Sequence, residues 1–246
     1  MVMTKKLYYE DVTRRTFCAT VLACESVNGA LRVALDATAF YPEGGGQPAD
    51  HGALGGACVT DVHEQDGVIW HTVTAPLPVG ETVQGDIDWS RRFDMMQQHT
   101  GEHIFSGILH MQYGFDNVGF HIGADTVTVD FNGQLSAKAL AEAELAANWV
   151  IWQGAPVTVT WPTRTELESL VYRSKKALTG EVRIVAAGGA DRCACCGTHV
   201  RSCSEVGAIK ILSAQNYKGG TRVMLVCGMR AWHDYCRRCD SVNAIS

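Results

Sequence analysis

The chain has 246 residues, of which 46% are hydrophobic and 19% charged, with 25 glycines against 6 prolines. This composition excludes disordered, collagenous and coiled-coil proteins, and the length favours two modest domains over one large one. No apolar run approaches the ~18 residues of a membrane span, and the charged start, MVMTKKLYYEDVTRR, is unlike a signal peptide. We therefore expect a cytoplasmic protein without a membrane partner.

Cysteine content and charge distribution narrow the class of function. The chain has ten cysteines, and without a secretory signal these favour metal ligands or free thiols over a disulfide framework. The net charge of -5 is unevenly spread, because residues 164–238 hold 13 basic and 6 acidic side chains, a local +7, and the remainder carries -12. Such a split allows one face to collect phosphates. An ordinary solvated basic surface is the alternative.

Residues 1–88 predict a small all-β domain, with a barrel as the favoured form. Turn signals separate short apolar segments such as ALRVAL, in which apolar and small or polar residues alternate. The pairs Asn28-Gly29 and Asp66-Gly67 are typical of hairpin turns.

A glycine-rich loop, FYPEGGGQPADHG, interrupts this domain. Its three consecutive glycines, Gly44, Gly45 and Gly46, permit backbone conformations and close approaches that side chains would block. No Gly-Lys-Ser/Thr follows, and the next element is predicted to be a strand, so the loop is not a phosphate loop of the Walker type.

Residues 89–246 predict a second domain of the α+β class, with helices packed on a mostly antiparallel sheet. A long helix follows the N-cap Asp88 and ends before Gly114, and an Ala- and Glu-rich helix ends at Gly154. The other predicted elements are a strand pair in FHIGADTVTVDFNG, the strand VTVTWPT, a short helix over 164–178, the strand EVRIVAAGG, an antiparallel pair turning at Lys218-Gly219-Gly220, and a final helix that has only begun where the sequence stops.

Two pairs of residues stand where they can share a metal ion. His99 and His103 are four residues apart in the long helix, so both imidazoles lie on one face. Cys195 and His199 repeat this spacing in the Gly-rich segment GGADRCACCGTHV. Three imidazole nitrogens and one thiolate suit tetrahedral Zn²⁺, so we predict one zinc ion per chain. For the first pair alone, ordinary helix-surface or core histidines are the alternative.

The remaining cysteines are less informative. Only Cys195 gives the four-residue step, but Cys193 and Cys196 flank it and stay open as ligands. We expect Cys203 and Cys227 to be buried apolar residues or free thiols. Near the end, HDYCRRC holds one histidine and two cysteines at helical spacing, without a fourth ligand.

The composition of the ligand set favours catalysis over a structural role. Structural zinc sites are mostly thiolate-rich, whereas this set is histidine-rich and comes from two distant segments. Four protein ligands fill the tetrahedron, so a substrate group or water must enter as a fifth ligand or displace one. The ion then positions the substrate more than it generates a hydroxide.

Three motifs together resemble one protein family. QQHTGEHIFSGIL and CCGTHV are similar to the HxxxH and CxxxH motifs of the alanyl-tRNA synthetase editing domain. FYPEGGGQPADHG resembles the Gly-rich motif of the free-standing alanyl-tRNA editing proteins of the larger type, and the likeness extends from Phe40 to Trp232. The resemblance implies a zinc-dependent aminoacyl-tRNA deacylase that removes serine, with glycine as a second candidate, from mischarged tRNA(Ala). It also implies an N-terminal β-barrel and an α+β editing domain.

The resemblance implies roles for particular residues in the editing domain. The implied zinc ligands are His99, His103, Cys195 and His199. Thr100 or Glu102 is implied to order a water or contact the amino acid, although family members tend to carry Gln or Thr in place of Glu102. Rejecting alanine requires a polar partner for the seryl hydroxyl, for which Thr128 fits better than Thr126.

The resemblance also implies how the acceptor end of the tRNA is held. Gly44, Gly45, Gly46 and Gln47 match the loop that similar proteins use to recognise this end. Independently of the resemblance, the locally basic segment is expected to hold the acceptor-stem phosphates through Arg164, Arg173, Lys175, Lys176, Lys218 and Arg222. A monomer and a dimer both stay open.

Two rival functions remain. His99 to His103 also satisfies HxxEH, an inverted zinc-peptidase motif with Glu102 as general base. That motif needs a third, usually acidic, ligand such as Glu181, and it leaves the CxxxH pair without a role. The second rival is a non-catalytic RNA-binding module in which zinc only stabilises the fold, so that tRNA is bound but never deacylated.

Overall fold

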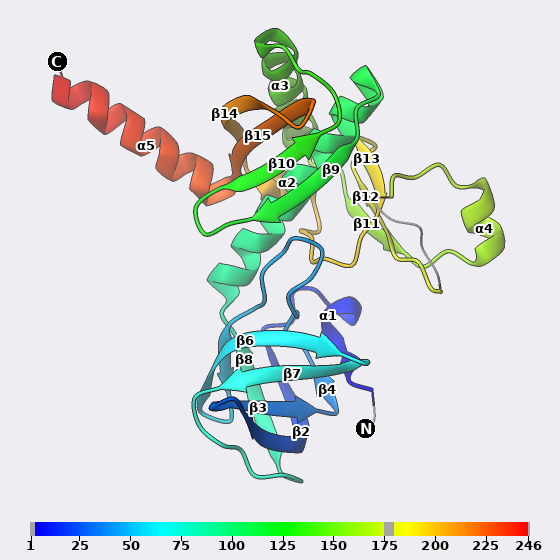
Figure 1. Ribbon diagram of the computed structural model, residues 1–246, viewed down its shortest axis with the longest axis vertical. Helices are drawn as coiled ribbons and strands as arrows, with labels where there is room; N and C mark the ends of the chain where they lie inside the picture. The colour runs from blue at the N-terminus through cyan, green and yellow to red at the C-terminus, as the bar shows by residue number, and fades with distance from the viewer. Residues whose placement is uncertain (1–2, 175–179, 246) are drawn as a thin grey trace. The chain divides into compact units, whose positions relative to one another are not determined.

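The computed structural model describes residues 3–174 and 180–245 (Figure 1). The chain divides into two compact units, Met1–Met95 and Met96–Ser246. The boundary predicted after residue 88 coincides with the start of helix α2, Trp89–Tyr113, whose first residues belong to unit 1. None of the described helices is long and apolar enough to cross a membrane.

Unit 1 consists mainly of short antiparallel strands. Six of them pair in a closed ring in the order β2-β3-β7-β6-β5-β8, and β1 pairs with β4 in parallel. The elements are β1 (Lys5–Lys6), α1 (Leu7–Glu10), β2 (Thr16–Val27), β3 (Ala30–Leu35), β4 (Ala37–Thr38), β5 (Gly52–Leu54), β6 (Ala57–Gln65), β7 (Val68–Val73) and β8 (Thr82–Ile87). Closure matters because a strand paired on both sides exposes no free backbone edge.

The two predicted hairpin turns are confirmed. Asn28 and Gly29, between β2 and β3, have φ values of 52° and 84°, and Asp66 and Gly67, between β6 and β7, have 52° and 77°. Left-handed conformations at both central residues define the turn whose twist matches that of paired strands. The short helix α1 was not predicted, because its four residues are too few to give a periodic signal.

A buried ion pair lies in the core of unit 1. Arg92, in the first turn of α2, is fully buried, and its Nε donates to both carboxylate oxygens of Asp50 at 2.9 Å. The guanidinium also donates to the carbonyl oxygens of Val12 and Ala39, and Asp50 accepts a further bond from the backbone N–H of Tyr41. Asp50 belongs to the Gly-rich motif, so this contact fixes the motif's C-terminal end to α2.

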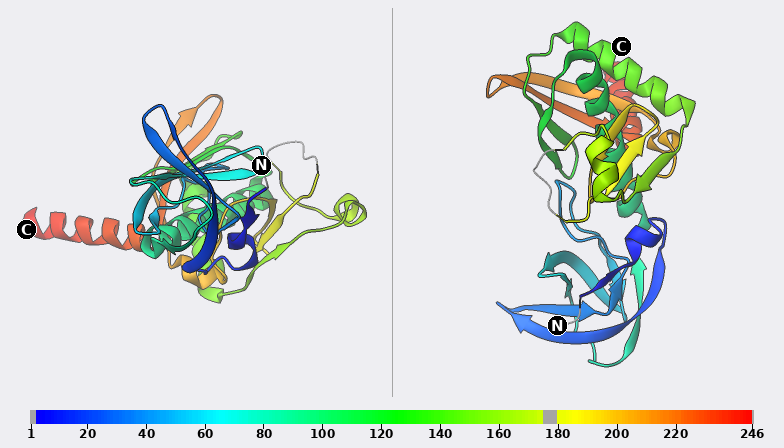
Figure 2. Two further views of the ribbon diagram at one scale, coloured as in Figure 1. Left: turned by 90° about the horizontal axis from the view of Figure 1, so that it is seen from below. Right: turned by 90° about the vertical axis from the view of Figure 1, so that its right-hand side faces the viewer.

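Unit 2 contains two antiparallel sheets flanked by helices (Figures 1 and 2). One sheet has the order β14-β15-β10-β9 and the other β11-β12-β13. Besides α2, the elements are β9 (Asn117–Ile122), β10 (Val127–Phe131), α3 (Ala137–Gln153), β11 (Val157–Thr160), α4 (Arg164–Ser169), β12 (Ile184–Ala187), β13 (Asp191–Ala194), η1 (Cys203–Val206), β14 (Ile209–Tyr217), β15 (Gly220–Cys227) and α5 (Gly228–Ile245). The predicted combination of helices with mostly antiparallel strands is confirmed.

The ends of the two main helices agree with the capping signals. Asp88 Oδ1 accepts from the backbone N–H of Arg91 at the start of α2, and Gly114 follows its last turn with φ 67°. Ser136 caps α3 in the same way, and Gly154 ends it in the left-handed conformation. These boundaries were predictable because caps and glycine stops are local signals.

The helix predicted over 164–178 is shorter than expected. A capping box at Thr163 starts α4, but the helix ends at Ser169. The next residues turn toward β13, where the backbone N–H of Arg173 donates to Arg192 O at 2.8 Å and its carbonyl accepts from Ala194 N. Pairing with a strand therefore replaces the helical pattern here. Residues 175–178 lie outside the described part of the chain.

Candidate metal centre

Helix α2 carries the first pair of candidate ligands. His99 and His103 lie one turn apart on its buried face, with 2% and 4% of their surfaces exposed and ring centroids 5.2 Å apart. Gly101 lies between them, and a Cβ there would collide with Cys227 Sγ at the end of β15. Gln98 reinforces this contact, since its side chain donates to Cys227 O at 2.9 Å and accepts from Cys227 N at 2.8 Å. The helix bearing both histidines is thus fixed against the sheet.

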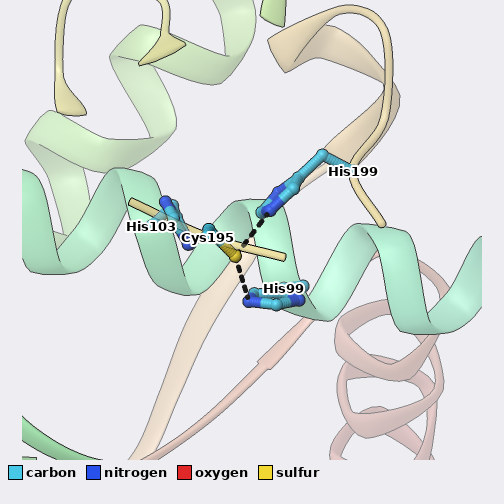
Figure 3. A group of neighbouring side chains, drawn as sticks. All are labelled: His99, His103, Cys195 and His199. Carbon is cyan, nitrogen blue, oxygen red and sulfur yellow. Dashed lines mark hydrogen bonds between the residues drawn. The ribbon is translucent and has the colours of Figure 1, made fainter. Parts of the chain in front are cut away.

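The second pair comes from the loop after β13. The side chains of Cys195 and His199 point toward the first pair (Figure 3). Cys195 Sγ lies 3.4 Å from His99 Nε2 and 3.3 Å from His199 Nε2. One candidate donor atom from each of the four side chains, His103 included, lies within 4.8 Å of the others. We call these four residues the His₃Cys cluster. Its donors are of the kind that hold a metal ion.

A buried arginine shapes the loop of the second pair. Arg183 Nη1 donates to Cys195 O at 2.7 Å and to Gly197 O at 2.9 Å. The loop then directs the backbone N–H of Gly197 to Cys195 Sγ at 3.3 Å. A hydrogen bond to sulfur favours the thiolate form that binds metals. Arg183 was not predicted as a site residue, because nothing in the local sequence indicates which distant carbonyls an arginine contacts.

Thr100 lies beside the cluster, behind one of its histidines. Its Oγ1 is 3.1 Å from His199 Nδ1 and accepts from the backbone N–H of Val200 at 3.2 Å. A ring that offers the Nε2 lone pair to a metal carries its proton on Nδ1, where it can donate to Thr100. The hydroxyl therefore orients a candidate ligand.

The electrostatics of the cluster suit a cation. Burial alone would raise the pKa of the Cys195 thiol, but the imidazoles of His99 and His199 hold it well below the usual 9. Burial lowers the pKa of His199 to about 3, so this ring is neutral at pH 7. His103 differs: burial opposes its charge, yet the Cys195 thiolate and Asp191 raise its pKa well above 6.5. An ion that binds here must therefore displace a proton from His103.

Glu102 is held away from solvent in a polar network. It is 1% exposed, and its Oε1 accepts from Ser106 Oγ and Asn117 Nδ2. In the described part of the chain, the histidine pair is joined by Cys195 and His199, and Glu181 is exposed and outside that cluster. The arrangement that HxxEH peptidases need is therefore not formed by these residues.

The other cysteines take different positions. Cys193 is buried on β13 and forms a group with His103 and Asp191, but not with the other ligands, while Cys196 is exposed. Cys203 and Cys227 are buried, which confirms the expectation that they are core residues. Among the described residues, HDYCRRC on α5 forms no group of converging ligand atoms.

Thr128 lies on β10, opposite His121 of β9 and Met224 of β15. The neighbouring pair, Val129 and Phe120, points to the other face of the sheet, because side chains alternate along a strand. That other face meets the cluster, since the Phe120 ring lies 5.0 Å from the His99 ring. Strand alternation therefore directs Thr128 away from His99.

The Gly-rich loop forms a tight turn in unit 1. Gly44 and Gln47 exchange backbone hydrogen bonds of 3.1 and 3.0 Å, and Gly45 and Gly46 between them have φ values of 60° and 86°. Tyr41 Oη donates to Gly44 O at 3.1 Å, and Gln47 is fully buried. The exposed part of this turn is backbone, chiefly at Gly45.

The predicted phosphate-binding residues differ in how free their charges are. Arg222 forms two hydrogen bonds with Asp130, of 2.6 and 2.7 Å, and stacks on Tyr217. Arg173 is 12% exposed and is paired with Asp191. Lys218 is exposed at the tip of the β14–β15 hairpin, and Arg164 is exposed on α4. Lys175 and Lys176 lie outside the described residues.

Two family models match the chain. The threonyl and alanyl tRNA synthetase second additional domain matches residues 182–224, the segment that contains Cys195 and His199. The class II (A) tRNA synthetase model matches residues 4–91, which lie in unit 1.

Three relatives are similar over nearly the whole chain. The alanyl-tRNA editing protein AlaX-L of Pyrococcus horikoshii is 35% identical over 93% of this chain and 59% of its own length. The alanine–tRNA ligase of Halorubrum lacusprofundi is 34% identical over 92% of the chain but only 26% of its own length. The alanyl-tRNA editing protein AlaX-M of Methanosarcina barkeri is 36% identical over 90% of the chain and 98% of its own length. The chain thus spans less than two thirds of the first two relatives and nearly all of the third.

Proposed function

The chain belongs to the family of alanyl-tRNA editing proteins, and on this basis we propose that it is an aminoacyl-tRNA deacylase that removes serine from mischarged tRNA(Ala). Glycine is the second candidate amino acid. The observation that carries the proposal is the convergence of the HxxxH and CxxxH pairs in one buried His₃Cys cluster. We propose that the chain has two domains. Unit 1, with its closed ring of strands, is the small β-barrel, and unit 2 is the editing domain.

We propose Zn²⁺ as the ion of the cluster, with His99, His103, Cys195 and His199 as its ligands. Three imidazoles and a thiolate match zinc in number and softness, and the N–H of Gly197 supports the negative sulfur. When bound, zinc supplies a Lewis acid that aligns and polarises the ester carbonyl.

The protein's own groups orient the ligands and the substrate. Thr100 keeps His199 Nδ1 protonated and its Nε2 available, which is a positioning role rather than a catalytic one. Glu102 already accepts two hydrogen bonds, so we propose that it supports the α2–β9 contact instead of ordering a water. A polar partner for the seryl hydroxyl accounts for rejection of alanine, because an unpaired buried group is costly when the hydroxyl is missing. The structure does not bring Thr128 to this hydroxyl, because strand alternation directs its side chain away from His99.

The tRNA is proposed to contact both units. The exposed backbone of the turn Gly44, Gly45, Gly46 and Gln47 is suited to the acceptor end, because its glycines allow close approach. Lys218 has an exposed charge for a phosphate, whereas Arg222 would first have to leave Asp130.

The deciding experiment compares hydrolysis of seryl-tRNA(Ala) and correctly charged alanyl-tRNA(Ala) by the zinc-loaded protein. We expect release of serine alone, abolished in His103→Ala. His110→Ala is the matched control, since His110 is on the same helix but 43% exposed and paired with Asp116. If neither charged tRNA is hydrolysed while zinc and tRNA are both bound, the chain is the RNA-binding module and the proposal is wrong.

A further inference from the structure

A row of alternating charges leads away from His103. His103 Nδ1 lies 2.8 Å from Asp191 Oδ2, and Arg173 Nε donates to Asp191 Oδ1 at 2.7 Å. The side chains of His103, Asp191 and Arg173 are 5%, 1% and 12% exposed. A carboxylate so deeply buried needs both partners, because removing a charged group from water carries a large desolvation penalty that only nearby opposite charges offset.

The contact between His103 and Asp191 serves two atoms that have no other partner. Both Nδ1 and Oδ2 are buried, and neither makes an aligned hydrogen bond with any described group, so the 2.8 Å approach between them is an ion-pair contact. Buried polar atoms rarely stay unsatisfied, so each of these atoms depends on the other. When Nδ1 of the neutral ring carries the proton, the lone pair is on Nε2.

The supporting residues are fixed by backbone pairing that does not involve the cluster. Asp191 begins β13, and its neighbour Arg192 accepts the backbone N–H of Arg173 at 2.8 Å. Arg173 in turn accepts from Ala194 N at 2.9 Å. Both charged side chains are thus anchored on the strand that leads directly into Cys195.

We infer that Asp191 is a positioning residue, which holds His103 in the orientation and tautomer that present Nε2 to the metal, and that Arg173 holds Asp191 in place. A carboxylate behind a ligating histidine raises the basicity of the ring and fixes its direction. The inference rests on the proposed function, because it takes His103 to be a ligand of the metal ion. It assigns Arg173 an internal role in place of the phosphate contact expected from the sequence.

The test is metal binding by Asp191→Asn, with no tRNA present. Zinc affinity is measured by competition with a chromophoric chelator, and the cobalt-substituted protein is examined by visible absorption. We expect zinc affinity to fall by about 10- to 100-fold, the usual effect of losing such a partner. The cobalt d–d bands should shift, and the thiolate-to-metal charge-transfer band should remain because Cys195 is unchanged.

Glu144→Gln is the matched control. Glu144 is another carboxylate of unit 2, 19% exposed, and it accepts from Lys210 Nζ and from the backbone N–H of Ile211, both at 2.6 Å. It should leave zinc affinity and the cobalt spectrum as in the wild type. Wild-type affinity and spectrum in folded Asp191→Asn would overturn the inference.

A second variant decides the matter if Asp191→Asn does not fold. Arg173→Lys keeps the positive charge but loses the directed Nε contact, so zinc affinity should fall several-fold. Unchanged affinity in Arg173→Lys would then overturn the inference. Because no readout involves deacylation, a wild-type protein that binds zinc without hydrolysing seryl-tRNA(Ala) contradicts the proposed function alone.

Discussion

Each unit of this protein buries a group of polar side chains, and the two groups differ in how they are satisfied. In unit 1, Asp50 meets the guanidinium of Arg92 and the N–H of Tyr41, so its charge is compensated within the chain. In unit 2, three imidazoles and a thiol turn their donor atoms toward one another within 4.8 Å. A cation satisfies such a set far better than the side chains satisfy each other. The first arrangement stabilises a fold, and the second prepares a binding site.

The largest expected effect comes from removing the thiolate of the cluster. Cys195→Ala should no longer bind zinc stoichiometrically, and its deacylation rate should fall by at least about 100-fold. This decrease is larger than the one expected when a residue that only supports a ligand is replaced. Zinc content by elemental analysis and single-turnover deacylation measure this. Cys193→Ala and Cys196→Ala are the controls. Zinc retained in Cys195→Ala but lost in either control would show that the ligand was misassigned.

Unit 1 should respond in stability rather than in chemistry. Asp50→Asn leaves the buried Arg92 without a countercharge, so the free energy of unfolding should fall by about 3–5 kcal/mol. Urea unfolding of the full chain, followed by circular dichroism, measures the loss. Zinc stoichiometry of the folded variant should stay at the wild-type value. A variant as stable as the wild type would mean that the pair is not the core element described above.

A buried histidine of unit 1 makes stability depend on pH. Burial lowers the pKa of His71 to about 4 from an ordinary 6.5, and its ring contacts Thr38 Oγ1 at 2.8 Å and Val33 O at 3.1 Å. The unfolded chain therefore binds a proton that the folded chain excludes. The neutral His71 therefore contributes about 3 kcal/mol to the free energy of unfolding. This contribution is complete above about pH 6.5 and is lost as the pH falls toward about 4.

The free energies of unfolding of the wild type and of His71→Gln are measured between about pH 7.5 and about pH 4, a range that spans the ordinary and the lowered pKa of this histidine. The contribution of His71 is the difference in slope between the two curves. The wild type should lose stability more steeply between pH 6.5 and 4. Parallel curves would assign the pH dependence to other groups.

The smallest expected effect concerns proton competition at the cluster. The pKa of His103 lies well above 6.5, because the Cys195 thiolate and Asp191 outweigh the effect of burial. Below that pKa, zinc must displace a proton, so affinity should fall about tenfold for each unit of pH, and binding at pH 7 should release protons. Calorimetry in buffers of different ionisation enthalpy counts them. Binding without proton release at pH 7 would contradict the assigned state of His103.

The features that the sequence predicted correctly depend on neighbouring residues. Asn28-Gly29 and the helix caps at Asp88 and Ser136 are local signals, and each is found where expected. The histidine pair is equally local, since a spacing of four in a helix places two rings on one face.

The features that the sequence did not predict depend on partners far along the chain. The helix that begins at Arg164 ends at Ser169, and Arg173 pairs with β13 where the sequence predicted further helix. The charges of Arg173 and Arg222 were expected to face phosphates, but Asp191 and Asp130 already hold them. A count of basic residues cannot reveal such pairs, because the partners are 18 and 92 positions apart.

The contact between Gly101 and Cys227 has a consequence for how these sequences can diverge. A methyl group at position 101 would occupy the space of the Cys227 sulfur, and Val206 closes a second side. The two positions are therefore expected to vary together in size: where a homologue carries alanine at the position of Gly101, glycine or alanine should replace Cys227. Packing of this kind leaves a covariation signal between two residues far apart in the chain. That signal would mark how closely the histidine-bearing helix lies on its sheet in each member of the family.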